Sequence, residues 1–181
     1  MDVSITMATA LEVRGLAKSY RAGAGLCAAS TRVLRSIDLS LYPGDAVGVV
    51  GDRGSGKSTL LLCLAGLLAP DAGMVRWFGD GSMSAAARHV LYHSSHMDLM
   101  RVGSAGCTHI HLVDLSAVAG LMCDLDAWIS LRQLAGDAVI VAARNPGALS
   151  ADIPMVSLIN GRLHRAENCA RVAEAVLATS S

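Results

Sequence analysis

The sequence predicts an α/β fold in which a mainly parallel sheet is flanked by helices and a small antiparallel β subdomain lies near the N-terminus. From residue 46 to residue 143, apolar strand patterns alternate with helical patterns, which is typical of a doubly wound sheet. A glycine-rich turn over residues 51–56 joins one of these strands to a helix. We expect a single domain, because 181 residues suffice for one sizeable core and are few for two.

The N-terminal part is predicted to be mostly strand. Residues 11–16 alternate between apolar and polar positions, and residues 33–42 carry a second strand pattern. Between them, residues 19–30 are rich in glycine and alanine, which predicts a loop. The turn Pro43-Gly44-Asp45 then leads into an apolar strand over residues 46–50.

The rest of the chain is predicted to alternate between helices and strands. A helix after the glycine-rich turn should run to about residue 68, because Pro70-Asp71-Ala72-Gly73 ends it. Further strands are expected over residues 74–78, 89–93, 109–115 and 138–143. Helical spacing predicts helices over residues 118–135 and 166–178, and Asn160-Gly161 predicts a terminal hairpin over residues 155–164.

The segment with the clearest chemistry is Gly51-Asp52-Arg53-Gly54-Ser55-Gly56-Lys57-Ser58-Thr59, directly after the apolar strand. Its spacing is that of a Walker A phosphate-binding loop, whose glycines let backbone N–H groups surround a polyphosphate while the lysine adds a positive charge. The expected phosphate contacts are Gly51, Arg53, Gly54, Ser55, Gly56, Lys57, Ser58 and Thr59. Ser58 can also ligate Mg²⁺ together with a carboxylate from elsewhere. The alternative is a glycine-rich turn without a ligand.

Composition argues against several classes of protein. The longest apolar stretches, such as residues 60–69, fall short of the roughly 18 residues that span a bilayer, and residues 1–10 do not form a secretory signal, so we expect a cytoplasmic protein. Five scattered cysteines without a C-x-x-C pair favour reduced thiols. Balanced charges and 3% aromatic residues leave no basic field or stacking platform for nucleic acid. The high apolar content indicates either a large core or a surface that another protein covers.

The order of motifs in the first 80 residues is that of a known family. The turn at residues 43–45, the loop at residues 51–59 and the segment Leu64-Ala65-Gly66-Leu67-Leu68-Ala69-Pro70-Asp71-Ala72-Gly73 resemble the nucleotide-binding domain of ABC transporters. The resemblance implies a P-loop NTPase core that binds ATP and Mg²⁺. In that family an aromatic residue stacks on adenine, and Tyr20 stands at the matching place. The alternative for Tyr20 is an ordinary half-buried tyrosine at the end of a strand.

Ile110-His111-Leu112-Val113-Asp114 resembles the second nucleotide motif of the same family, in which the aspartate contacts Mg²⁺. The alternative for Asp114 is a helix-capping aspartate. Leu115 stands where the family places the glutamate that polarises water, and Arg144 stands where it places a switch histidine. Leucine cannot accept a proton, so we expect weak hydrolysis while ATP binding is retained. Arginine can hold a γ-phosphate but cannot switch its protonation near neutral pH.

Two further departures separate the chain from the family pattern. His93 occupies the place of a glutamine that the family uses for magnesium contact and for coupling to a membrane partner. The interval between His93 and Asp114 is too short for the family's helical subdomain, and the chain lacks the Leu-Ser-Gly-Gly-Gln signature. We read Gly103-Ser104-Ala105-Gly106 as a turn. Residues 1–181 are therefore predicted to form a single ABC-type nucleotide-binding domain without the helical subdomain.

A group of histidines and one cysteine lies in the stretch where that subdomain is missing. Its members are His89, His93, His96, Cys107, His109 and His111. Imidazole and thiolate suit zinc, and strand alternation would put Cys107, His109 and His111 on one face, with His89 or His93 alongside. The alternative is that these side chains are packed or solvated, since no H-E-x-x-H or C-x-x-C spacing is present.

These observations predict an ATP-binding subunit of ABC-transporter type with weak or partner-dependent hydrolysis. A partner subunit with a signature motif and a membrane permease would complete it, which places the protein in the cytoplasm, against the inner face of the cell membrane when it is bound to the permease. One alternative is an active P-loop ATPase that positions water with another group, such as Asp124 or Asp126 on the following helix. Another is an interaction protein that has lost nucleotide binding.

Overall fold

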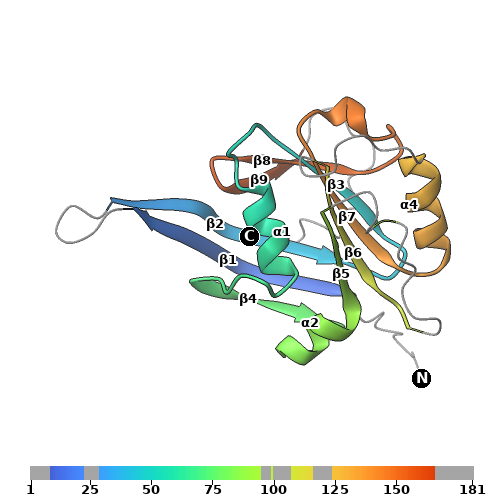
Figure 1. Ribbon diagram of the computed structural model, residues 1–181, viewed down its shortest axis with the longest axis horizontal. Helices are drawn as coiled ribbons and strands as arrows, with labels where there is room; N and C mark the ends of the chain where they lie inside the picture. Colours follow the sequence, from blue (N-terminus) through green and yellow to red (C-terminus); the bar gives the residue numbers. More distant parts are fainter. Residues whose placement is uncertain (1–8, 23–28, 95–98, 100–106, 116–123, 166–181) are drawn as a thin grey trace, which may run out of the picture.

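The computed structural model of the protein describes residues 9–22, 29–94, 99, 107–115 and 124–165. Two sheets make up most of this part of the chain (Figure 1). The strands are β1 (Leu11–Ala22), β2 (Ala29–Leu41), β3 (Ala46–Val50), β4 (Ala72–Trp77), β5 (Val90–His93), β6 (Ile110–Asp114), β7 (Ala138–Ala143), β8 (Met155–Ile159) and β9 (Arg162–Arg165). The described helices are α1 (Lys57–Leu64), α2 (Met83–His89) and α4 (Leu125–Leu134), with a short 3-10 turn at Pro146–Ala148.

The larger sheet has the strand order β5-β6-β7-β3-β8-β9, and all of its neighbouring pairs are parallel except β8 and β9. The smaller sheet is antiparallel, with the order β2-β1-β4. The sequence-based prediction of a mainly parallel sheet, flanked by helices and joined to an antiparallel β unit near the N-terminus, is therefore confirmed.

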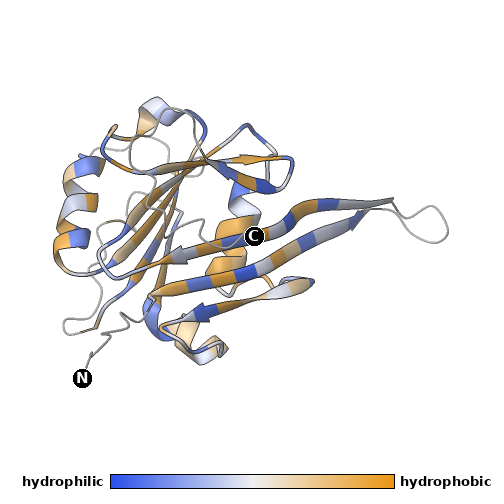
Figure 2. Ribbon diagram, turned by 180° about the vertical axis from the view of Figure 1, so that it is seen from behind, coloured by the Kyte–Doolittle hydropathy of each residue, from blue (hydrophilic) through white to orange (hydrophobic). Residues whose placement is uncertain are grey.

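The three central strands of the parallel sheet are buried along their whole length. Every residue of β3, β6 and β7 is buried, and Figure 2 shows mostly hydrophobic residues along these strands. By contrast, hydrophilic and hydrophobic residues alternate along the two long antiparallel strands β1 and β2 (Figure 2). Continuous apolar strands are expected where both faces of a sheet are covered, whereas alternation is expected where one face meets solvent.

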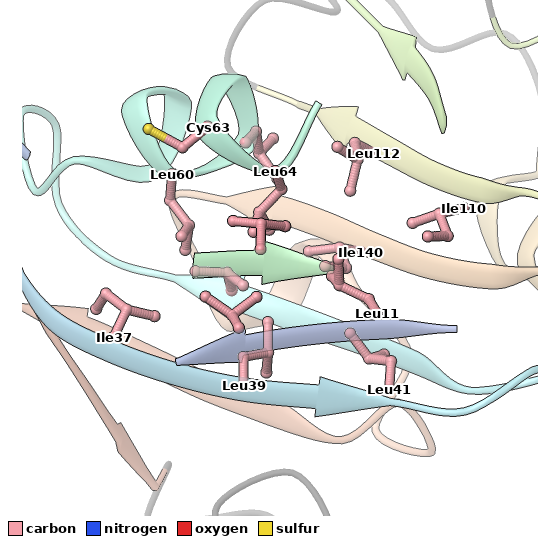
Figure 3. Packing of buried hydrophobic residues seen from close by; sticks show 14 of the residues in the cluster. Leu11, Ile37, Leu39, Leu41, Leu60, Cys63, Leu64, Ile110, Leu112 and Ile140 are labelled. Atoms are coloured by element: carbon pink, nitrogen blue, oxygen red, sulfur yellow. The ribbon is translucent and has the colours of Figure 1, made fainter. Parts of the chain in front are cut away.

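The main core lies where α1 packs between the two sheets. Leu60 and Leu64 of α1 meet Leu39 of the antiparallel sheet and Leu112 and Ile140 of the parallel sheet in one buried cluster (Figure 3). A second buried cluster on the opposite face of the parallel sheet includes Ile129 of α4. Burial of a leucine-sized side chain contributes about 1.5–3 kcal/mol, so the placement of α1 is strongly determined.

The antiparallel hairpin is longer than its glycine and alanine content indicated. The prediction of a loop over residues 19–30 was wrong at both ends, because β1 continues to Ala22 and β2 begins at Ala29. Tyr20 pairs with Thr31 and Arg21 with Ser30. Ladder hydrogen bonds satisfy the backbone here, so pairing overrides the low strand propensity of the local sequence.

Two predictions about helices also need correction. The helix after the glycine-rich loop ends at Leu64 rather than near residue 68, because Gly66 adopts a left-handed conformation with φ 70° and the N–H groups of Leu67 and Leu68 turn back to the carbonyl oxygen of Leu62. The helix α2 was not predicted, although Ser82 caps it by accepting a hydrogen bond from the Ala85 N–H group.

The remaining predicted elements agree with the structure in the part that it describes. The strands predicted after residue 45 and the terminal hairpin are present, with shifts of one or two residues at their ends. The helix predicted over residues 118–135 corresponds to α4 in the part that the structure describes. The helix predicted over residues 166–178 lies outside the described residues. Within the described ranges, no helix is long and apolar enough to cross a membrane.

The contact between the β8–β9 turn and β2 gives a first prediction. Gly161 has φ 76°, and a Cβ at this position would collide with the backbone carbonyl oxygen of Val33. We expect Gly161→Ala to lower the free energy of unfolding by about 1–3 kcal/mol, because it adds backbone strain and separates the turn from β2. Gly147→Ala is the matched control, since Gly147 has no positive φ and a Cβ there meets nothing within 4 Å. Equal denaturation midpoints for both variants would contradict this account.

Candidate functional site

The glycine-rich loop lies between the end of β3 at Val50 and the start of α1 at Lys57. Gly54 and Gly56 adopt left-handed conformations with φ 83° and φ 104°. A Cβ at Gly51 would lie 2.7 Å from the Leu158 carbonyl oxygen, and one at Gly56 would lie 2.8 Å from Cγ1 of Val33. The loop therefore needs glycine both for its backbone angles and for its close contacts with neighbouring strands.

Lys57 is held inside this loop. Its residue is 6% exposed, and Nζ donates to the carbonyl oxygens of Gly51 at 2.6 Å and Asp52 at 2.8 Å. Burial lowers the pKa of Lys57, while the negative charge of Asp114 opposes this shift. Nζ also donates to the Ser55 hydroxyl oxygen at 3.3 Å. A cation held by neutral dipoles in a partly desolvated loop is well suited to bind an anion there.

Ser58 and Asp114 meet at the carboxyl end of the parallel sheet. The Ser58 hydroxyl, on the first turn of α1, donates to Oδ2 of Asp114 at the end of β6 over 2.6 Å. Asp114 is 2% exposed. The predicted pair of magnesium ligands thus comes together from distant parts of the sequence. A hydroxyl and a carboxylate are hard oxygen donors of the kind that Mg²⁺ prefers, so the residues present fit this ion.

A cavity of about 610 Å³ opens over the loop and the start of α1. It is lined by Val33, Arg53, Gly54, Gly56, Lys57, Ser58, Thr59 and Arg144. Its volume lies within the range of small-molecule sites, roughly 300–1,000 Å³. Six of the residues predicted to contact phosphate or magnesium line this cavity, and so does Arg144. Gly51 and Ser55, which were also predicted, line an adjoining cleft on the other side of the loop.

Tyr20 lies beside this cavity, near the end of β1. It is 43% exposed, and its hydroxyl oxygen is 3.4 Å from the Thr59 hydroxyl oxygen on α1. An exposed ring next to a phosphate-binding loop is available for stacking on a planar base. The location agrees with both expectations for this residue, a stacking platform and a half-buried tyrosine near a strand end.

Leu115 and Arg144, which stand at the places of the expected catalytic glutamate and histidine, lie in different surroundings. Leu115 is partly buried and packs against the second core cluster, and its N–H group donates to the Ala142 carbonyl oxygen. Arg144 lines the cavity, and its positive charge also lowers the pKa of Lys57. Of the suggested substitute acids, Asp124 caps α4 by accepting from two N–H groups, and Asp126 accepts from the Ser150 N–H group. Neither lines the cavity.

Sequence reasoning missed Tyr92 on β5. Burial raises the pKa of its phenol, and the negative charge of Asp114 adds to the effect. Tyr92 packs against the core cluster that contains residues of α1, so it lies on the face of the sheet that α1 covers. The sequence could have indicated this position, because neighbouring residues of a strand such as Tyr92 and His93 point to opposite faces of the sheet.

His93 points away from the phosphate-binding loop and joins a buried polar network. Its Nε2 is 2.9 Å from Nδ1 of His111, and Nε2 of His111 is 3.2 Å from Oδ2 of Asp137. The Asp137 carboxylate also accepts from the His109 N–H group at 2.8 Å. The rings of His93 and His111 stack, with Trp128 edge-on to both. Strand pairing does bring His93 alongside His111, as expected from the pattern.

The other members of the histidine and cysteine group lie elsewhere. His89 packs against Phe78 and is hydrogen-bonded to the Thr108 carbonyl oxygen, and Cys107 is exposed. His96 lies outside the described residues. In the ranges that the structure covers, no three His, Cys, Asp or Glu side chains are arranged to hold a metal ion. Packing accounts for the positions of His89, His93 and His111 without one.

Residues 34–105 match the model of the family described as ABC transporter. The lipoprotein-releasing system ATP-binding protein LolD 2 of Caulobacter vibrioides is 48% identical over 65 residues, which cover 36% of this chain and 27% of that protein. The macrolide export ATP-binding/permease protein MacB of Azoarcus sp. is 44% identical over 70 residues, which cover 39% of this chain and 10% of that protein. The hemin import ATP-binding protein HmuV of Nocardia farcinica is 41% identical over 91 residues, covering 50% and 27%. The chain thus matches less than a third of the length of each.

Solved structures of ATP-binding cassettes share the fold. A dimeric cassette in a post-hydrolysis state with ADP and Pi aligns with a TM-score of 0.62 and 15% identity, over 90% of this chain and 100% of that chain. The ADP conformation of an ATP-binding cassette of an ABC transporter aligns with a TM-score of 0.63 and 14% identity, over 89% and 92%. At this level of identity the likeness concerns the fold alone.

The buried histidine network predicts a pH-dependent stability. Burial lowers the pKa of His111 from 6.5 to about 4, the nearby His93 and Arg132 add to the effect, and Asp137 opposes it. As the pH falls, His111 is protonated in the unfolded chain before it is protonated in the folded chain. The free energy of unfolding therefore keeps its full value above about pH 6.5 and decreases as the pH drops toward 4. We expect a loss of about 2 kcal/mol between pH 7.5 and pH 5 from this residue.

Denaturant unfolding at both pH values checks this expectation. His111→Gln should flatten the pH dependence, whereas His164→Gln should leave it unchanged, because His164 is exposed on β9. The same pH dependence in the wild type and in His111→Gln would show that another group is responsible.

Proposed function

We propose that this chain is a relative of the ATP-binding proteins of ABC transporters and that it binds Mg-ATP in the cavity over the glycine-rich loop; the match of residues 34–105 to the family model and the shared fold support this. Its own hydrolysis is weak or depends on a partner. ATP therefore acts mainly as a bound ligand that controls assembly with a second nucleotide-binding subunit and a membrane permease.

The hydrogen bond between Ser58 and Asp114 carries the proposal. Two oxygen ligands, 2.6 Å apart, lie directly below the loop that holds Lys57. A chance glycine-rich turn gives no reason for a buried carboxylate at this place. When bound, Mg²⁺ would neutralise part of the phosphate charge, and Ser58 and Asp114 are the residues that would hold it.

The remaining residues of the cavity suit a polyphosphate. Lys57 would exchange its carbonyl partners for phosphate oxygens, and the backbone N–H groups of the loop and of the first turn of α1 would surround the same anion. Arg144 and Arg53 add positive charge from the rim of the cavity. Tyr20 would cover the base from the end of β1.

Weak hydrolysis follows from what lies next to Asp114. The side chain of Leu115 packs in an apolar cluster and cannot accept a proton from water. Arg144 can stabilise negative charge, but it cannot serve as a base near neutral pH. The cavity lining includes no carboxylate. Among the described residues that line the cavity, binding groups are therefore present without a carboxylate that could activate water, which favours a subunit that depends on another chain for turnover.

Thermal unfolding with and without Mg-ATP tests the binding. We expect Mg-ATP to raise the melting temperature of the wild type and to have little effect on Lys57→Ala, because the buried cation is lost. Asp114→Asn should abolish the magnesium dependence of the shift. Asp126→Asn is its matched control, since it removes an equal charge outside the cavity. The proposal fails if ATP gives no shift in the wild type, or if Lys57→Ala responds as the wild type does.

The role of Tyr20 gives a separate prediction. A stacked ring is worth about 1–3 kcal/mol per base, so Tyr20→Ala should weaken ATP binding about tenfold. Tyr20→Phe keeps the ring and should bind nearly as the wild type does. Titration calorimetry compares the three proteins, with inorganic triphosphate as a ligand that lacks the base. If Tyr20→Ala weakens triphosphate binding as much as ATP binding, Tyr20 does not stack on the base.

A further inference from the structure

A second cleft, of about 590 Å³, adjoins the first and shares Val33, Arg53, Gly54 and Arg144 with it. Its walls are the first half of β2, the glycine-rich loop, the β8–β9 turn and the segment after β7. Four arginines from three different elements line it, namely Arg32 and Arg35 on β2, Arg53 in the loop and Arg144 after β7. Asp52 is the single carboxylate in the lining. The cleft therefore concentrates positive charge in a chain whose total formal charge is zero.

Several of the arginines outside the cleft form ion pairs with carboxylates, whereas Arg21 and Arg162 have none among the described residues. Outside the cleft, Arg14 and Arg76 pair with Glu12, Arg88 pairs with Asp80, and Arg132 pairs with Asp137. Among the residues that the structure describes, no carboxylate forms an ion pair with any of the four cleft arginines. Like charges gathered without a partner repel one another, and an anionic ligand would relieve this repulsion.

One part of the cleft wall is fixed by a backbone hydrogen bond, while the four arginine side chains are exposed. The Arg35 N–H group donates to the Gly161 carbonyl oxygen over 2.7 Å, so the β8–β9 turn is fixed against β2. Asn160 in this turn has φ 50° and is one of the residues that line the cleft. The backbone that carries Arg35 is thus held in place beside the loop that carries Arg53. Less conformational freedom is then lost when a ligand binds.

We propose that this cleft binds a second phosphate-bearing small molecule next to the nucleotide. Guanidinium groups contact phosphate oxygens through two parallel N–H donors, and a polyphosphate offers enough oxygens for several arginines. The volume fits a small ligand rather than a long peptide. Arg53 and Arg144 line both cavities, so the charge of one ligand is felt by the other.

Pyrophosphate binding to the full chain tests this proposal in a Lys57→Ala background, in which the phosphate-binding loop has lost its buried cation. Titration calorimetry at low salt should show saturable binding that remains after this change. Adding Arg35→Gln should weaken it about tenfold, because Arg35 lines the second cleft and not the first. Adding Arg88→Gln removes the same charge on α2 and should leave binding unchanged.

Three results would overturn the proposal. The first is that pyrophosphate does not bind saturably in the Lys57→Ala background. The second is that Arg35→Gln and Arg88→Gln weaken its binding equally. The third is that a short poly-glutamate peptide binds through Arg35 while pyrophosphate does not, which would make the cleft a docking site for an acidic segment of another protein. All three outcomes are independent of whether ATP binds the wild type, so this site and the proposed function can fail separately.

Discussion

The packing of α1 between the two sheets determines where each part of the site lies. Its buried leucines fix the helix against both sheets, and this places the first residues of α1 at the carboxyl end of the parallel strands. Ser58 then meets Asp114, Lys57 turns into the loop, and Thr59 comes within reach of Tyr20. Ligands bind at this end of open α/β sheets as a rule, because loops and helix starts converge there. Core packing thus positions the binding groups before any ligand is present.

The site combines strong binding groups with a missing base. A hydroxyl, a carboxylate and a buried lysine are arranged as the proposed nucleotide site requires, whereas the residue after Asp114 is a leucine that packs against the second core cluster. The histidine at position 93 is used in a buried network with His111 and Asp137 and is not directed toward the loop. Leu115, at the place of the expected base, is packed in the core, and the lining of the cavity contains no carboxylate that could take its role. This arrangement supports the proposal that turnover depends on another chain.

Much of the fold and the loop of the site could be predicted from the sequence, because hydrophobic periodicity and glycine spacing are local signals. The partnership of Ser58 and Asp114 was also predictable, since parallel strands end at the same edge. The long hairpin of β1 and β2 was not, because cross-strand pairing such as Tyr20 with Thr31 outweighs local propensity. The second cleft could not be foreseen either, because Arg35, Arg53 and Arg144 are far apart in sequence and line one cleft only in the folded chain. The helix α2 was missed because a short alanine-rich segment gives little periodic signal.

The central claim is that this chain binds Mg-ATP without turning it over by itself. The most direct test measures phosphate release from the purified chain at an ATP concentration that saturates binding. The account predicts release no faster than that of Lys57→Ala in the same assay, and faster release only after a second nucleotide-binding subunit is added. Steady release by the wild type alone, lost in Lys57→Ala, would contradict the account and show that a residue of this chain activates water.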